Sequence, residues 1–264
     1  MDKRNRLLVL AVVLSGFVAG AGADAVRAEE GRLTLALGTE YTTGEYGGEK
    51  SIEDLYIPVT AYYDLSRFSF RLTVPFLQVK APEGTLIETP DGDIIVGEGP
   101  RTTESGIGDV VAGFTVYDVF LSASGDVAVD VSGNVKLGTA DENKGLGTGE
   151  TDFSLGLDFY RFFDRFTAIG ALGYTWRGDP EGYDLDNTIY VSLGGSYRVA
   201  TATRVGVFYD YRQASLPEND DPQELSVFLS RWFGDRWMLR GYALAGFGDS
   251  SPDFGVGVSA SRGF

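Results

Sequence analysis

The feature that most constrains this chain is a two-residue alternation between apolar and small or polar residues, which recurs along most of its length. In the first such segment Leu33, Leu35 and Leu37 form one face, and the residues between them are small or polar. A period of two places successive side chains on opposite faces of a β-strand. The pattern therefore predicts an all-β chain in which each strand separates an apolar from a polar environment.

About twelve segments of this kind are delimited by interruptions of Asp, Gly, Asn or Pro. They cover residues 32–41, 51–63, 67–79, 106–118, 125–137, 151–161, 166–177, 187–199, 203–213, 223–232, 237–247 and 253–264. Short turns, such as 163–165, alternate with longer loops, such as 80–104, and this asymmetry is typical of outer-membrane barrels. The pattern predicts a transmembrane antiparallel up-and-down β-barrel of about twelve strands in the bacterial outer membrane.

The start of the chain is expected to be a secretory signal peptide over residues 1–28. A basic beginning is followed by an apolar run at 7–18 that is too short to span a bilayer comfortably, and small residues then offer cleavage after Ala23 or Ala28. Residues 29–264 would then form the barrel.

Aromatic residues gather beside the short turns, where a barrel carries an interfacial girdle. This girdle is expected to comprise Tyr62, Tyr63, Tyr160, Phe162, Phe163, Trp232, Phe233 and Trp237. The last segment alternates as far as Phe264, and such a terminal aromatic is similar to the signal read by the barrel-assembly machinery, although Arg262 stands where an apolar residue is usual. These features favour the barrel over a secreted soluble β-sandwich.

The composition excludes several classes of function. The chain has no His and no Cys, which removes Ser-His and Cys-His nucleophiles, zinc and copper sites, and disulfides. The remaining enzymatic alternative is a carboxylate pair, either Asp126 with Asp130 or Asp152 with Asp158, but lumen carboxylates more often pair with bases. With 38 acidic against 22 basic residues, the chain would repel nucleic acid. We therefore expect no enzyme, no cofactor and no metal ion.

Charged residues of both signs fall on the polar face and are candidates for lining the lumen. They are Arg71, Asp126, Asp130, Lys136, Asp158, Arg204, Asp210, Arg212 and Arg240. Either they form ion-paired ladders that fill a narrow barrel, or some of them line a solute path and set its charge preference. Small inward residues, such as Ser154 and Gly156, make a continuous path possible.

Two prolines fall inside consecutive segments, where a residue without an N–H group is tolerated only at edges, strand starts or bulges. If the turn at 64–66 joins these segments, Pro58 and Pro75 lie nearly opposite each other in the outward half of the wall. Either they mark a bulge near the rim, or they form a kink through which an apolar solute leaves sideways into the membrane.

The long loops carry two further signals. In loop 80–104 two short apolar runs flank residues 90–93, which predicts a hairpin that covers the mouth as a lid or extends the wall. Acidic residues cluster around 141–142, 179–186 and 218–221. They are expected to form a solvated surface or, through divalent cations, to bind lipopolysaccharide beside the outer-membrane lipid.

Three stretches resemble a known family. Residues 135–141 read Val-Lys-Leu-Gly-Thr-Ala-Asp, residues 145–152 read Gly-Leu-Gly-Thr-Gly-Glu-Thr-Asp, and residues 105–109 read Ser-Gly-Ile-Gly-Asp. They are similar to the motifs of the family named after the MetA pathway of phenol degradation. The resemblance implies an outer-membrane transporter for aromatic or other hydrophobic small molecules, and it supplies no site residues. On their own, the glycines are expected to be turn residues, because no helix follows to form a phosphate cradle.

Two functions are compatible with these observations. The leading one is a channel for the passive uptake of small, hydrophobic or aromatic solutes through the barrel. The alternative is a non-conducting barrel that anchors, adheres or signals through its acidic external loops. Strand number does not separate them, because inward side chains can occlude a lumen of about twelve strands.

Overall fold

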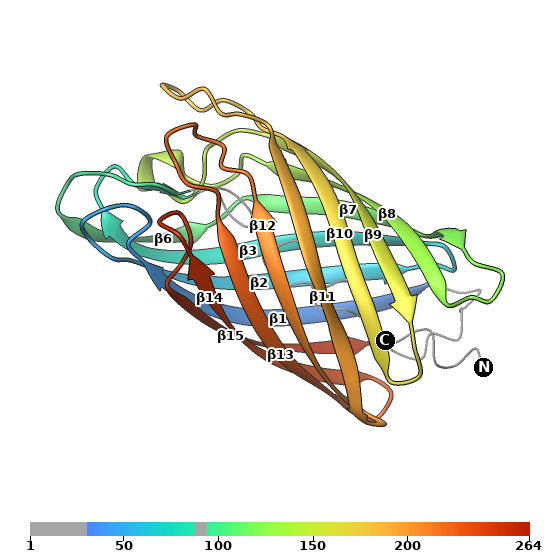
Figure 1. Cartoon of the computed structure of the whole chain (residues 1–264). Coiled ribbons are helices and arrows are strands. Elements are labelled where there is room, and N and C mark those ends of the chain that lie inside the picture. Colours follow the sequence, from blue (N-terminus) through green and yellow to red (C-terminus); the bar gives the residue numbers. More distant parts are fainter. Residues whose placement is uncertain (1–30, 88–93) are drawn as a thin grey trace.

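The computed structural model describes residues 31–87 and 94–264, and their antiparallel strands follow one another in chain order around a single wall (Figure 1). The wall strands are β1 (Arg32–Gly44), β2 (Ile52–Asp64), β3 (Phe68–Pro82), β6 (Arg101–Ile107), β7 (Val110–Leu121), β8 (Val127–Leu137), β9 (Asp152–Phe162), β10 (Phe166–Trp176), β11 (Thr188–Ala200), β12 (Thr203–Arg212), β13 (Gln223–Phe233), β14 (Trp237–Phe247) and β15 (Phe254–Gly263). Because β6 and β7 both pair with β3 and share one place in the wall, the described residues form twelve wall positions.

The wall closes on itself. The first strand, β1, pairs with β2 on one side and with the last strand, β15, on the other. Thr34 lies opposite Gly263 in the closing pair, and Thr43 lies opposite Phe254. A closed ladder leaves no strand edge to face lipid, as the interior of a membrane requires. The predicted barrel and its strand number are confirmed, whereas the predicted signal peptide lies outside the described residues.

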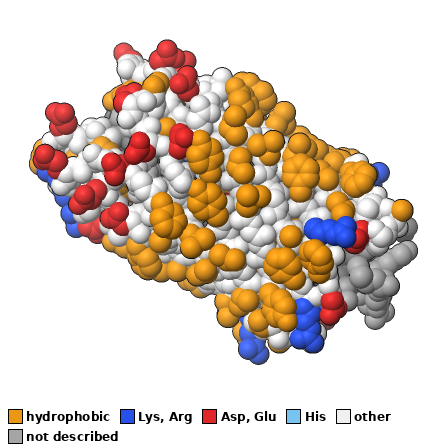
Figure 2. Space-filling model, in the orientation of Figure 1, with side chains coloured by type: hydrophobic (Ala, Val, Ile, Leu, Met, Phe, Trp, Pro, Cys, Tyr) orange, Lys and Arg blue, Asp and Glu red, His pale blue; other side chains and the backbone are white. Residues whose placement is uncertain are grey.

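The outer face of the wall is apolar. Alternate side chains along the strands point outward, and the large apolar ones are exposed on the isolated chain: Leu193 on β11 is 60% exposed and Leu37 on β1 is 57% exposed. Figure 2 shows such side chains as a broad band across the face in view, with acidic side chains gathered toward the end that carries the long loops. A soluble surface rarely carries an apolar patch of this extent. The band is therefore the lipid-facing belt of the barrel.

The described residues contain no helix that is both long enough and apolar enough to cross a membrane.

The two ends of the barrel differ, as the sequence predicts. Short turns join β2 to β3, β7 to β8, β9 to β10, β11 to β12 and β13 to β14 at one end, and longer loops join the strands at the other (Figure 1). Within one long loop, β4 (Leu86–Ile87) and β5 (Ile94–Ile95) form the predicted hairpin. Below it, β3 and β6 pair as far as Pro82 opposite Arg101, so this loop extends the wall.

The aromatic girdle is only partly confirmed. Its outward members, which are exposed, are Tyr63, Phe163, Phe233 and Trp237. The other predicted members, Tyr62, Tyr160, Phe162 and Trp232, occupy inward positions. The prediction was wrong for these four because side chains alternate between the two sides of the wall, so the position of an aromatic residue along the strand decides whether it can reach the lipid interface.

Arg262 has a physical explanation as the unusual charge on the terminal strand. Its guanidinium carbon lies 5.4 Å from the centre of the Trp237 ring and 4.8 Å from that of Phe264. A cation over aromatic faces at these distances is favourable. Arg262 thus belongs to the periplasmic interface, where a charge can reach water.

A charge in the middle of the apolar belt should be costly. We expect Leu193→Arg to destabilise the folded barrel by about 2 to 4 kcal/mol, the range for a cation at the bilayer midplane. Urea titration of the protein folded into vesicles measures the change, with Leu193→Met as the control. Equal midpoints for the two variants would show that this position does not face lipid.

Candidate functional site

The lumen is narrowed by its own side chains. Tyr160, Ile169, Tyr190 and Phe208 point inward from neighbouring strands and form one buried cluster. Phe228 stacks on Phe208 with 6.0 Å between ring centres. The lumen on this side is therefore lined by aromatic rings as well as by charges.

The candidate lumen residues mostly have local partners. Arg71 donates to the side-chain oxygen of Asn134 at 2.7 Å, and Asp210 accepts from the Tyr190 hydroxyl at 2.6 Å. Asp130 accepts from the backbone N–H of Asp118 at 2.7 Å. These contacts hold each charged side chain close to the wall.

The remaining candidates other than Lys136 fall into three places. Asp158 lies directly opposite Asp130 between β9 and β8, and both are buried. Inward positions of β12 and β14 carry Arg204, Arg212 and Arg240, with Arg204 buried beside Ser196 and Arg240 over the Phe228 ring at 4.8 Å. The turn before β8 holds Asp126, which accepts from Ser122 and Ser124 and pairs with Arg161 at 2.8 Å. Asp126 thus lies at the rim, apart from Asp130.

The prolines face each other in an unbroken β2–β3 register. Pro58 and Pro75 both point into the barrel and are fully buried. On the other side of β2, no pairing joins residues 57–58 to residues 38–39 of β1, although both stretches are described. The β1–β2 ladder is thus interrupted beside Pro58.

A second interruption lies beside Pro75. Thr73 pairs with Val111 and Phe76 pairs with Ile107, so three steps along β3 match four steps along β6 and β7. This is a bulge, and inside it the N–H of Gly108 donates to the carbonyl of Pro75 at 3.0 Å. The proline pair is therefore flanked on both sides by stretches of weakened wall.

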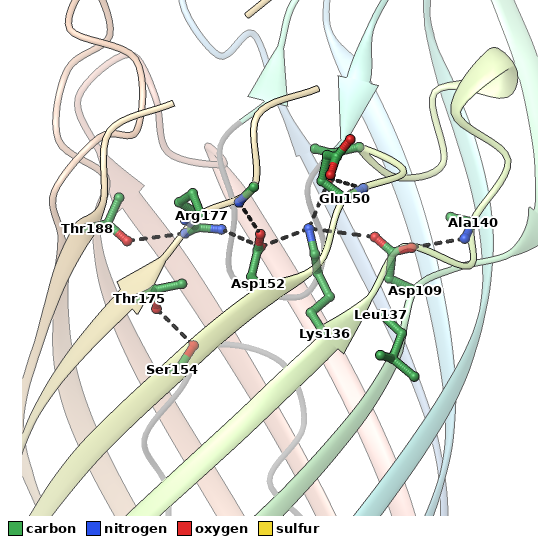
Figure 3. Close-up of polar contacts among 12 residues, drawn as sticks. Asp109, Lys136, Leu137, Ala140, Glu150, Asp152, Ser154, Thr175, Arg177 and Thr188 are labelled. Atoms are coloured by element: carbon green, nitrogen blue, oxygen red, sulfur yellow. Dashed lines mark hydrogen bonds and ion pairs between the residues drawn. The ribbon is translucent and has the colours of Figure 1, made fainter. Parts of the chain in front are cut away.

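A buried row of charges crosses the outer ends of neighbouring strands (Figure 3). The Lys136 ammonium lies 2.9 Å from a carboxylate oxygen of Asp152 and 3.7 Å from one of Asp109. Arg177 lies 3.4 Å from the same Asp152 oxygen. All four side chains are at most 8% exposed. Sequence reasoning singled out Lys136 but missed Arg177, which continues the inward positions of β10 just beyond its end.

The charged row also holds the loop between β8 and β9. One carboxylate oxygen of Asp109 accepts from the backbone N–H groups of Thr139 and Ala140, each at 2.9 Å. Lys136 donates to the Thr148 hydroxyl at 3.1 Å. This loop, residues 138–151, contains the 3₁₀ turn η2 (Glu142–Lys144) and is called the glycine-rich loop below.

Two glycines let this loop pack closely against its neighbours. A Cβ on Gly145, whose φ is 68°, would lie 2.0 Å from the carbonyl oxygen of Thr85. A Cβ on Gly147 would lie 2.7 Å from the Asp109 carboxylate. Turn chemistry alone, as expected from the sequence, therefore accounts for only part of the glycine pattern. Close packing requires the rest.

The residue between these glycines enters the barrel. Leu146 is fully buried. It belongs to an apolar cluster on the inner face of β2 and β3, called the mouth cluster below: Ile52, Tyr56, Leu77, Val79, Ala81 and Leu146. Sequence reasoning missed Leu146, although it is the one large apolar residue between the glycines of the motif.

Three loops cover the mouth cluster. Tyr46, Val96 and Ala140 pack against it, one from each of the first three long loops. Burial raises the pKa of the Tyr46 phenol well above its usual range, so its hydroxyl stays neutral. The outer mouth therefore holds an apolar core instead of open water on this side of the lumen.

Comparison with known proteins agrees with this architecture. A family described as "Putative MetA-pathway of phenol degradation" matches residues 54–261. The crystal structure of the COG4313 outer membrane channel from Pseudomonas putida F1 superposes with a TM-score of 0.70 at 12% identity, covering 94% of this chain and 100% of that one. No curated protein matches the chain significantly.

Two porins are also similar. The NanC porin has a TM-score of 0.56 at 9% identity, with 86% of this chain and 98% of that one covered. The KdgM porin has a TM-score of 0.52 at 9% identity, with 88% and 99% covered. At such identities the likeness establishes the fold of an outer-membrane barrel and leaves the solute open.

Removing the central cation of the charged row should be costly, because it leaves two buried carboxylates facing each other. We expect Lys136→Met to destabilise the barrel by about 3 to 5 kcal/mol. Arg161→Met, which breaks an exposed ion pair at the rim, should leave the urea midpoint unchanged. Equal effects of the two substitutions would contradict the role of the buried row.

Proposed function

Because the chain belongs to the family described as "Putative MetA-pathway of phenol degradation", which matches most of its length, we propose that it is an outer-membrane channel for the passive uptake of small hydrophobic or aromatic molecules. The mouth cluster carries this proposal. A water-filled porin has a polar interior. Here Ile52, Leu77 and Leu146 are fully buried inside the outer mouth, where the transfer of an apolar solute from water is favourable.

The alternative, a non-conducting barrel that acts through its loops, is favoured by one observation. Many inward side chains, including Tyr190 and Phe208, are almost completely buried, so the lumen holds little free space around them. The acidic loops would then be the working surface. The two functions differ in whether the protein passes a solute at all.

A sideways exit is the second part of the proposal. The two interruptions beside Pro58 and Pro75 lie in the wall that carries the mouth cluster, since Leu77 follows Pro75 by one inward position on β3. An apolar solute that reaches this cluster is therefore next to an interrupted stretch of wall. Leaving into lipid avoids the charged and aromatic lumen below.

The partners of the barrel follow from its ends. We propose that Phe264, which is 59% exposed at the end of the chain, is read by the barrel-assembly machinery, and that the acidic loops bind lipopolysaccharide through divalent cations. Deleting Phe264 should lower the amount of assembled barrel in outer-membrane fractions, and unchanged assembly would contradict the role of Phe264.

Chelating magnesium should release lipopolysaccharide bound to the acidic loops. Unchanged binding of lipopolysaccharide would contradict the role of these loops.

Solute uptake is measured on the refolded protein in liposomes. We expect phenol and benzoate to enter faster than a pentose of similar size, after subtraction of the leak through protein-free liposomes. The apolar mouth gives the reason, because a sugar has to shed its hydration there. If neither class shows protein-dependent uptake, the non-conducting barrel is the better account.

The lateral exit is tested by restoring the missing N–H groups. We expect Pro58→Ala with Pro75→Ala to let the ladders beside them close, and to lower the uptake of the aromatic solutes by about tenfold while the folded fraction stays the same. Pro252→Ala, in the loop before β15, serves as the control. Aromatic uptake that is unchanged in the double variant would show that the solute leaves by another route.

A further inference from the structure

The Leu146 side chain occupies an apolar site within the mouth cluster, called the seat below. This site has the properties of a ligand site that is already filled. The side chain comes from a loop, is fully buried, and lies among Ile52, Tyr56 and Leu77 of two wall strands. A loop leucine that only had to be buried away from water could pack against the other loops, without reaching the inner face of the barrel. The seat therefore accepts an apolar group of about the size of a small solute.

The seat is covered by separable parts. Tyr46 lies in the loop between β1 and β2, Val96 follows the β4–β5 hairpin, and Ala140 lies in the glycine-rich loop itself. Each loop is tied to its own strands. Separation of the Tyr46 loop from Val96, which Gly48 contacts, would open the seat toward the outside without breaking the wall.

The glycine-rich loop is fastened on both sides of Leu146. On one side Asp109 holds the N–H groups of Thr139 and Ala140, and on the other Lys136 holds Thr148. These contacts are polar, whereas the seat is apolar. Hydrogen bonds to Asp109 and Lys136 thus hold the loop in place, and the Leu146 side chain takes no part in them. Its position in the mouth cluster is therefore not required for these hydrogen bonds.

We infer that the mouth cluster is a binding site for a small apolar or aromatic solute, and that Leu146 occupies it as a competing internal ligand until the solute displaces it. The inference rests on the proposed uptake function and specifies where the solute is first bound. A tethered side chain competes at a high effective concentration, so it sets how much solute is needed to fill the site. Leu146 then fills the site when no solute is present.

Shortening the internal ligand tests this directly. Phenol binding to the refolded barrel is measured by calorimetry for wild type and for Leu146→Ala. Because a seat that is free more of the time binds more tightly, the variant should have an apparent Kd about tenfold lower. Leu216→Ala is the matched control, since Leu216 is a buried leucine in another long loop and lies outside the mouth cluster.

The outcomes separate the two proposals. An apparent Kd that is unchanged or higher in Leu146→Ala, with protein-dependent uptake of aromatics by the wild type, would overturn the inference alone. No protein-dependent uptake by the wild type would overturn the proposed function itself. A tighter Kd in both leucine variants would also count against the inference, because the effect would then be general loosening of the loops.

A reversible crosslink gives a second test that does not alter Leu146. A Cβ on Gly48 would lie 3.8 Å from the Cβ of Val96, which suits a disulfide, and the chain has no other cysteine. In Gly48→Cys with Val96→Cys, oxidation should lower benzoate uptake by about tenfold, and reduction should restore it. Equal benzoate uptake by the fully oxidised and the reduced double variant would overturn the inference. Each single cysteine variant controls for the effect of its substitution.

Discussion

The structure depends on one constraint: inside a membrane the backbone finds no water, so its N–H and C=O groups must pair within the protein. Closure of β1 onto β15 meets this requirement around the whole wall. The alternation of side chains follows, because each strand then has one face toward lipid and one toward the lumen. Among the described residues, pairing is interrupted beside Pro58 and Pro75, where inward side chains fill the wall from within. The register also shifts near the short turns that follow β7 and β11.

The function is set where the barrel meets the outside. A glycine-rich loop turns inward, and buried charges contributed by β8, β9 and the ends of β7 and β10 hold it there. Lys136 is central because it links two carboxylates and the loop at once. A buried pair of this kind adds little net stability but is costly to disrupt, so it is suited to fixing one position of the loop. On the proposed function, the apolar mouth cluster beneath the loop selects which solutes are accepted.

The sequence predicted the strands well because alternation is a local property. The segments expected at 166–177 and 237–247 match β10 and β14 within a residue. The inward path of the glycine-rich loop was not predictable in this way, since it depends on Asp109, which lies about 30 residues away in sequence and becomes a neighbour only when β7 pairs with β8. Too many aromatic residues were assigned to the girdle for a local reason. Their closeness to the short turns gave their height in the membrane, but the side of the wall that each one faces depends on the exact register of its strand.

The central claim is that an aromatic solute binds inside the outer mouth. Crystals of the barrel soaked with 4-iodophenol test it most directly, because the anomalous signal of iodine locates the ligand without assumptions about the loops. We expect an iodine site in contact with Ile52, Tyr56 and Leu77, with Leu146 displaced. Iodine found only in the detergent around the belt, with Leu146 still seated, would contradict it.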